Sequence, residues 1–186
     1  MSGRHRGGRS ARRFTELGVL LAVVVAAAAC GGATPATTFP PPGTTPQPAG
    51  DATAAASAEV IGALAELGLQ ATDAVRSYRP PEGPLLAAAP RTVLQAGLPE
   101  DPTHGYIVIY LFSSPLDAAA AARDQAAYVS TGPGRINFPP GTRFVLRIVG
   151  PTVVFFHWSP EVSTDDRTRN IEDALLRIGS GVPVPG

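Results

Sequence analysis

Residues 143–158 read RFVLRIVGPTVVFFHW and contain two apolar runs joined by the pair Gly150-Pro151. Both runs, Arg143–Val149 and Thr152–Trp158, are rich in β-branched and aromatic residues, which are typical of strands. A glycine-proline pair between two such runs is a tight-turn signal. The sequence therefore predicts a β-hairpin at 143–158.

Four further segments outside this hairpin are expected to be extended. Tyr106–Phe112 is a continuous apolar run, as found in central strands that are buried on both faces. Arg91–Ala96 is expected to pair with it as a neighbouring strand. Gln70–Tyr78 is a weaker strand candidate, and residues 135–138 are expected to form a short extended piece.

Three segments carry helix signals. Ser57 is the expected N-cap of the first helix, and Gly68 is the expected left-handed residue that ends it. Ser114 and Pro115 supply an N-cap serine and a proline at the first helical position of the second. The third shows apolar residues at the helical spacing i, i+3, i+4 and i+7. The predicted helices are 57–68, 114–129 and 163–179.

The order of these elements predicts the fold class. Helices packed against a mostly antiparallel sheet form an α+β two-layer sandwich with three helices. A strand–helix–strand unit at 106–149 should cross over with a right-handed turn, which favours a ferredoxin-like arrangement. We expect a single domain over 57–180, followed by a flexible tail at 181–186.

The first 29 residues have the pattern of an export signal. Residues 1–13 contain five arginines and no acidic residue, and the apolar run Leu17–Ala29 follows. That run has 13 residues, whereas a membrane-spanning helix needs roughly 20. Ala27, Ala28 and Ala29 supply small residues directly before Cys30, the only cysteine of the chain. The pattern predicts a signal peptide at 1–29 that is cleaved between Ala29 and Cys30.

This N-terminus resembles the bacterial lipobox, in which small residues precede an invariant cysteine. The resemblance implies that the Cys30 thiol receives a diacylglyceryl group and that Cys30 becomes the acylated N-terminus. Two or more acyl chains would anchor the protein stably at the extracytoplasmic face of the cell membrane. The usual lipobox has leucine at the position of Ala27, so ordinary cleavage and secretion remain an alternative, as does an uncleaved anchor. Arg12-Arg13 leaves both twin-arginine and general secretory export open.

Residues 30–56 are expected to be a disordered tether. Residues 31–56 contain six prolines and six threonines, with Asp51 as the one charge, so little apolar surface is present to offset the entropy of ordering. Without residues 1–29 the chain keeps ten arginines and 14 acidic residues, a net charge of −4. A mildly acidic protein has no electrostatic attraction for nucleic acid or anionic lipid. The membrane contact is therefore expected to be the acylated Cys30.

Residues 63–179 also resemble a family of small, uncharacterised bacterial lipoproteins. The similarity rests on structural motifs and implies a fold without an activity. These motifs are ALAELG at 63–68, YIVIYLF at 106–112 with an alanine-rich helix after it, FPP at 138–140 and VLRIVGPTVVFFHW at 145–158.

Few residues suited to catalysis or metal binding remain after cleavage. His104 and His157 are the only histidines, and a zinc site needs three or four ligands, so no metal or cofactor is expected. The acidic pairs at 100–101 and 165–166 fit a turn and a helix start. The glycine-rich segment 131–135 follows a helix, whereas a phosphate-binding loop precedes one, so we expect an ordinary loop there. The sequence indicates no catalytic constellation, and we expect the protein not to be an enzyme.

Alternation along the hairpin suggests a surface for a ligand or partner. Phe156 and Trp158 share one face of their strand, and Arg143 and Arg147 share a face of the neighbouring strand. If helices cover only one face of the sheet, these residues could form a patch on the other.

Three functions are compatible with these features. We expect a non-enzymatic binding or accessory module whose partner is an unknown envelope protein or a small ligand. The alternative is a small envelope hydrolase, which requires a pocket where His104 or His157 meets a carboxylate or a serine. A purely structural envelope component is the third.

Overall fold

The computed structural model describes residues 49–185. The predicted signal peptide, Cys30 and residues 31–48 of the predicted tether lie outside the described residues. The helices are α1 (Ala49–Glu66), α2 (Pro84–Ala88), α3 (Pro115–Ser130), α4 (Gly132–Arg135) and α5 (Thr168–Leu175). The strands are β1 (Ala71–Asp73), β2 (Arg91–Ala96), β3 (Tyr106–Leu111), β4 (Arg143–Val149), β5 (Thr152–Trp158) and β6 (Ser180–Gly181).

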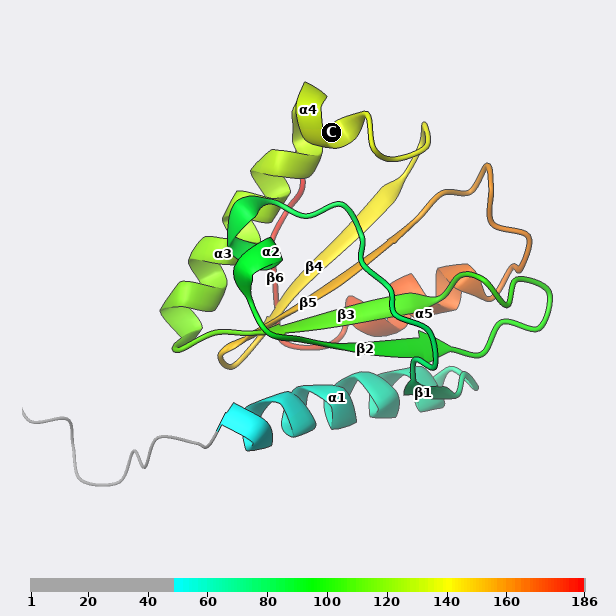
Figure 1. Cartoon of the computed structure of the whole chain (residues 1–186). Helices are drawn as coiled ribbons and strands as arrows, with labels where there is room; N and C mark the ends of the chain where they lie inside the picture. Colours follow the sequence, from blue (N-terminus) through cyan, green and yellow to red (C-terminus); the bar gives the residue numbers. More distant parts are fainter. Residues whose placement is uncertain (1–48, 186) are drawn as a thin grey trace, which may run out of the picture. The chain divides into compact units, whose positions relative to one another are not determined.

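The strands of the described chain form one sheet in the order β1-β2-β3-β5-β4-β6, and every neighbouring pair is antiparallel (Figure 1). β4 and β5 form the predicted hairpin, in which Val149 pairs with Thr152 around the turn. Gly150 in that turn has a φ of 56°, which glycine adopts without steric cost. The predicted α+β class and antiparallel sheet are confirmed.

Two helical crossovers place helices on both faces of the sheet. α3 joins β3 to β4 across β5, and α5 joins β5 to β6 across β4. β3 and β5 run in opposite directions, yet both crossovers step toward the β6 edge. Crossover connections of this kind are right-handed. Two right-handed crossovers that move in the same direction across the sheet, but start from strands of opposite direction, place their helices on opposite faces of the sheet. The unit β3–α3–β4, in which β5 lies between the two parallel strands, also occurs in ferredoxin-like folds. In those folds the second crossover runs toward the edge opposite to the one that the first crossover approaches.

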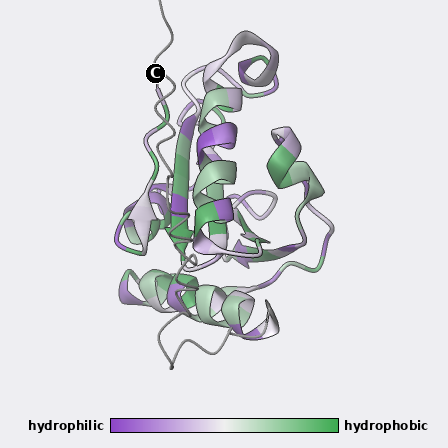
Figure 2. Cartoon of the chain, turned by 90° about the vertical axis from the view of Figure 1, so that its left-hand side faces the viewer, coloured by the Kyte–Doolittle hydropathy of each residue, from purple (hydrophilic) through white to green (hydrophobic). Residues whose placement is uncertain are grey.

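Each face of the sheet carries its own apolar core, so that a helix-on-sheet sandwich forms on either side. From the side of α3, hydrophobic strands are visible behind a helix of mixed hydropathy (Figure 2). One core joins α1 and α5 to the strands through Val60, Leu64, Leu94, Ile107, Ile109, Val154, Phe156, Ile171 and Leu175. The other joins α2 and α3 to the strands through Leu86, Val108, Tyr110, Ala118, Ala122, Val129, Leu146, Val153 and Phe155.

Helix α3 begins as predicted from its sequence. The Ser114 hydroxyl accepts a hydrogen bond from the Asp117 backbone N–H at 3.2 Å, and Pro115 is the first helical residue. Its inward face is mostly alanine, with Ala118, Ala121 and Ala122 at most 1 % exposed. Such small side chains let the helix axis approach the sheet closely.

Helix α1 begins eight residues earlier than predicted. Ser57 lies inside the helix, and residues 49–56 of the predicted tether belong to it. The alanine-rich segment has high intrinsic helix propensity. Ala52, Ala56 and Val60 recur every four residues and are buried, so this part of the helix packs against the domain. The predicted end at Gly68 is confirmed by its φ of 73°.

Several other boundaries differ from the prediction. The third predicted helix begins at Thr168 rather than near Ser163, because residues 159–167 form a loop. Residues 132–135, expected as a loop, form the short helix α4, and 135–138 is not extended. The strand expected over 70–78 is limited to β1. Helix α2 was not anticipated.

Within residues 49–185, no helix is both long enough and apolar enough to span a membrane.

The buried face of α1 leads to a test of where the domain begins. Ala56 is 0 % exposed, whereas its neighbour Ala55 is exposed. We expect Ala56→Asp to lower the free energy of unfolding by at least about 2 kcal/mol, because it buries an unpaired carboxylate. The matched variant Ala55→Asp should change it by less than about 0.5 kcal/mol. Urea unfolding of the mature chain measures both, and equal effects would contradict the early start of α1.

Candidate functional site

A cavity of about 250 Å³ lies at the end of the sheet where β3 begins and β5 ends. Its floor comes from these two strands, and its rim comes from the β2–β3 loop and the β5–α5 loop. The segment between β1 and α2 contributes one more wall. The side chains that matter for its chemistry are Tyr78, His104, Tyr106, His157, Trp158 and Ser163.

The cavity has an aromatic wall formed by Tyr78 and Tyr106. Their rings stack with centroids 4.3 Å apart and an angle of 10° between planes. The Tyr78 hydroxyl lies 2.8 Å from Nε2 of His157, at the end of β5. The three rings thus connect a loop segment to two central strands.

Contacts around Glu82 position the segment that carries Tyr78. The Glu82 side chain is only 2 % exposed and accepts hydrogen bonds from the Tyr110 hydroxyl at 2.6 Å and from Arg79 at 2.8 Å. The adjacent Gly83 N–H donates to the Gln125 side chain on α3 at 2.7 Å. Residues 79–83 are therefore fixed against β3 and α3, which holds Tyr78 against Tyr106.

His157 and Tyr78 are both uncharged near neutral pH. Burial, with a smaller repulsion from His104, lowers the pKa of His157 to about 4. Burial is also the main reason that the pKa of Tyr78 is raised to about 12, with smaller contributions from Tyr106 and Glu82. Desolvation disfavours the charged form of each group, the imidazolium and the phenolate. The hydrogen bond between them therefore joins two neutral rings.

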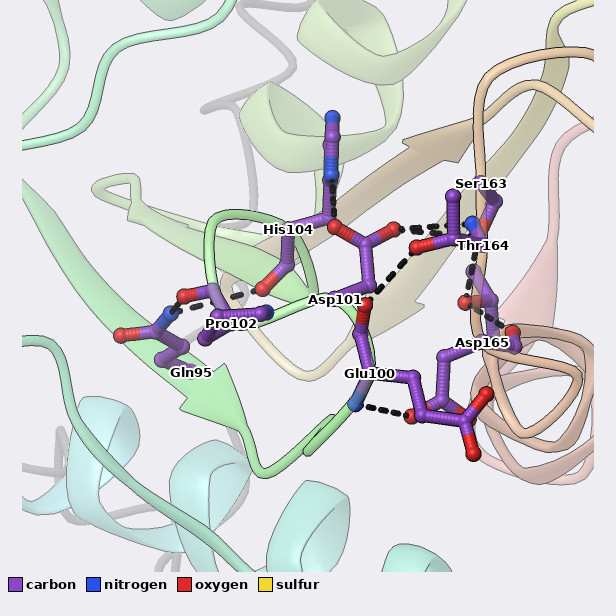
Figure 3. A network of polar contacts seen from close by, with 9 residues as sticks. Gln95, Glu100, Asp101, Pro102, His104, Ser163, Thr164 and Asp165 are labelled. Atoms are coloured by element: carbon purple, nitrogen blue, oxygen red, sulfur yellow. Dashed lines mark hydrogen bonds and ion pairs between the residues drawn. The ribbon is translucent and has the colours of Figure 1, made fainter.

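His104 lies at the rim and is oriented by Asp101. The Asp101 carboxylate, 5 % exposed, forms an ion pair or hydrogen bond with Nδ1 of His104 (Figure 3). It also accepts hydrogen bonds from the Ser163 hydroxyl at 3.4 Å and from the Thr164 N–H at 3.3 Å. Asp101 thus connects the β2–β3 loop to the β5–α5 loop, and both loops contribute residues to the cavity lining.

Asp165 makes a second connection between the same two loops. Its carboxylate accepts a hydrogen bond from the Glu100 N–H at 3.2 Å (Figure 3) and is bound by Arg167 at 2.5 Å. The hydrogen bonds from Arg167 lower the pKa of Asp165 to about 2. The Thr164 hydroxyl closes the contact by donating to the Glu100 carbonyl at 2.8 Å. The predicted turn and helix-start acids therefore also hold the cavity rim together.

The two histidines that were singled out in the sequence line the same cavity. His104 contacts a carboxylate, which is the geometry that a general base and its orienting acid require. The Ser163 hydroxyl, however, is hydrogen-bonded to Asp101 and at 2.7 Å to Thr168, rather than to His104. Within residues 49–185 no group of three or more histidines, cysteines and acids is arranged to hold a metal ion.

The predicted patch of Arg143, Arg147, Phe156 and Trp158 does not form one open surface, because Phe156 is buried and the other three side chains bind other parts of the chain, although the Arg143 side chain is 49 % exposed. Phe156 is 1 % exposed, in the core beneath α1 and α5. Glu172 of α5 accepts hydrogen bonds from Arg143 at 2.7 Å and from the Trp158 indole at 2.8 Å. Arg147 donates to the carbonyls of residues 178 and 179. The prediction of an open patch is wrong because helices cover both faces of the sheet; only Trp158 reaches the cavity.

Sequence reasoning missed the two tyrosines and the role of Asp101. Tyr78 lies at the end of the weak strand candidate 70–78, and its separation of 79 residues from His157 left no local signal for their contact. The spacing of Asp101 and His104 in a proline-containing loop was a usable signal for an acid–imidazole pair.

Comparisons with protein-family models, with curated proteins and with solved structures gave no match.

The depressed pKa of His157 predicts a pH dependence of stability. Between pH 6.5 and pH 4 the unfolded chain binds a proton at His157 that the folded chain does not, so stability falls as the pH is lowered through this range. Each pKa unit corresponds to about 1.4 kcal/mol, so the loss attributable to His157 is roughly 2–3 kcal/mol.

Urea unfolding at pH 7 and pH 4.5 measures this loss for the wild type and for His157→Gln. We expect the variant to lose about 2 kcal/mol less than the wild type on acidification. A proton NMR titration of the wild type checks the cause directly, with an expected His157 midpoint near pH 4. A midpoint near pH 6.5 would contradict it.

Proposed function

We propose that this protein is an exported, lipid-anchored module of the cell envelope that binds a small ligand without transforming it. The observation that carries the binding function is the cavity between Tyr78, Tyr106 and His157. It combines aromatic walls with a hydrogen-bonded pair of neutral rings. Such a concave, mostly apolar site with a few convergent polar groups is the usual form of a small-molecule site.

The location of the protein is inferred from the N-terminal sequence. A basic segment, a short apolar run and small residues directly before Cys30 support export followed by lipid attachment. Helix α1 begins at Ala49, so 18 residues separate Cys30 from the described domain. We propose that this segment holds the domain and its cavity at a distance from the membrane surface.

The rigidity of the cavity rim supports binding. Asp101 and Asp165 fix to each other the two loops that contribute to the cavity lining, and Glu82 fixes the segment with Tyr78. A preformed site loses little conformational entropy when a ligand binds, which favours affinity.

A small hydrolase is the second candidate, favoured by the Asp101–His104 pair beside the cavity. In that function Asp101 would orient the imidazole, and Nε2 of His104 would remove a proton from a water molecule. Saturable ester hydrolysis that His104→Gln abolishes would favour this candidate over a binding protein.

Mass spectrometry of the intact protein tests the anchor. We expect the wild type isolated from its cell to lack residues 1–29 and to carry acyl chains on Cys30. The Cys30→Ala variant should carry none and should leave the membrane fraction. Wild-type protein that is released without a lipid would refute the anchor while leaving the cavity unaffected.

A second experiment tests the binding function through the cavity rim. Val162 lines the cavity and is 48 % exposed, whereas Val75 is 97 % exposed and lies outside it. We expect native mass spectrometry of the wild type, isolated from its own cell, to show a small non-covalent adduct. Val162→Phe should lose the adduct because the larger ring occupies the cavity, and the matched Val75→Phe should keep it.

An adduct that is equally present in both variants would place the ligand elsewhere. Absence of any adduct from the wild type would count against the binding function.

A further inference from the structure

We propose that the cavity selects an uncharged, ring-bearing small molecule that donates a hydrogen bond, such as a phenol or a cyclic alcohol. This inference rests on the proposed binding function and names its ligand class. Three properties of the cavity carry the inference: its charge, its size and the hydrogen-bonding capacity of its walls.

The cavity offers no unpaired counter-charge to a ligand, because the imidazole of His104 at its rim is already paired with Asp101. Its described lining contains no arginine, aspartate or glutamate, and the chain contains no lysine. The nearby carboxylate of Asp101 is already bound by His104, Ser163 and Thr164, and that of Asp165 is bound by Arg167. A charged ligand would lose its hydration without gaining an unpaired partner, which is costly.

The titration of the wall residues agrees with this conclusion. Burial lowers the pKa of His157, whose charged form is a cation. Burial also raises the pKa of Tyr78, whose charged form is an anion. Both changes favour the neutral species. The environment therefore disfavours positive and negative charge alike.

The size and the walls of the cavity favour a single ring. A volume of about 250 Å³ lies between the roughly 150 Å³ of a cavity that binds benzene and the lower limit of about 300 Å³ for drug-sized ligands. One six-membered ring with one or two substituents fits this range. Tyr78, Tyr106 and Trp158 offer aromatic surface, on which planar rings stack favourably.

The hydroxyl groups of the wall favour a ligand that donates. Thr142, Ser159 and Thr168 already donate their protons to the carbonyls of Pro139, Pro140 and Asp165, respectively. A hydroxyl has one proton and two acceptor lone pairs. Ser159 already accepts from the Glu161 N–H at 3.3 Å and the Thr168 hydroxyl lies 2.7 Å from that of Ser163, so each of these two groups retains one lone pair for a further donor. A hydroxyl on the ligand can use that capacity, whereas an ether oxygen cannot.

Four fluorinated probes of similar size separate these properties. The probes are 4-fluorophenol, the anionic 4-fluorobenzoate, the cationic 4-fluorobenzylamine and 4-fluoroanisole, which is neutral but cannot donate. Binding to the mature chain is followed by ¹⁹F NMR titration at pH 7.4, where the phenol is neutral because its pKa is about 10. Val162→Phe and Val75→Phe serve as the blocked and unblocked variants.

We expect 4-fluorophenol to bind to the wild type and to Val75→Phe and to lose binding in Val162→Phe. Each charged probe should bind at least tenfold more weakly than the phenol, and anisole should bind more weakly than the phenol. A charged probe that binds as tightly as the phenol would overturn the inference and leave the binding function standing. Equal binding of anisole would overturn the requirement for a donor, and the failure of all four probes would count against both proposals.

Discussion

The constraint on which the structure depends is that the central strands β3 and β5 are apolar on both faces. Ile107 and Ile109 point to one core and Val108 and Tyr110 to the other, and all are at most 1 % exposed. β5 repeats this pattern with Val153 to Phe156. An antiparallel sheet with such strands is stable only if both faces are covered, because leaving one face in water would expose a large apolar surface.

The connections of the chain satisfy this constraint through crossover geometry. The two crossovers, made by α3 and α5, step in the same direction from antiparallel strands, so α3 and α5 reach opposite faces. Helix α1 completes the layer of α5, and α2 completes the layer of α3. The loops that enter β3 and leave β5 are then brought to the same end of the sheet. The cavity forms there, framed by backbone that the acids Asp101 and Asp165 hold together.

The cavity unites residues from four separate parts of the sequence, which explains how little of it was predictable. His104 and His157 were identifiable as the only histidines outside the signal peptide, and the structure brings both to one cavity. Their partners were not identifiable. Tyr78 reaches His157 because Glu82 is held by Tyr110 and Arg79, and no pattern near Tyr78 encodes that contact. The arginine and aromatic patch was predicted to be open because the positions of the helices were unknown.

By itself the sequence determined the features that depend on neighbouring residues. These are the hairpin around Gly150-Pro151, the apolar strand β3, the Ser114 cap of α3, the α+β class and the basic and apolar pattern before Cys30. The tertiary structure alone decided which faces are covered, where α1 begins and which side chains meet in the cavity. Turns, caps and periodicities arise from interactions within a few residues, and so they are visible in the sequence. The covering of a face and the meeting of Tyr78 with His157 arise from contacts between distant segments, which depend on the direction and hand of the crossovers.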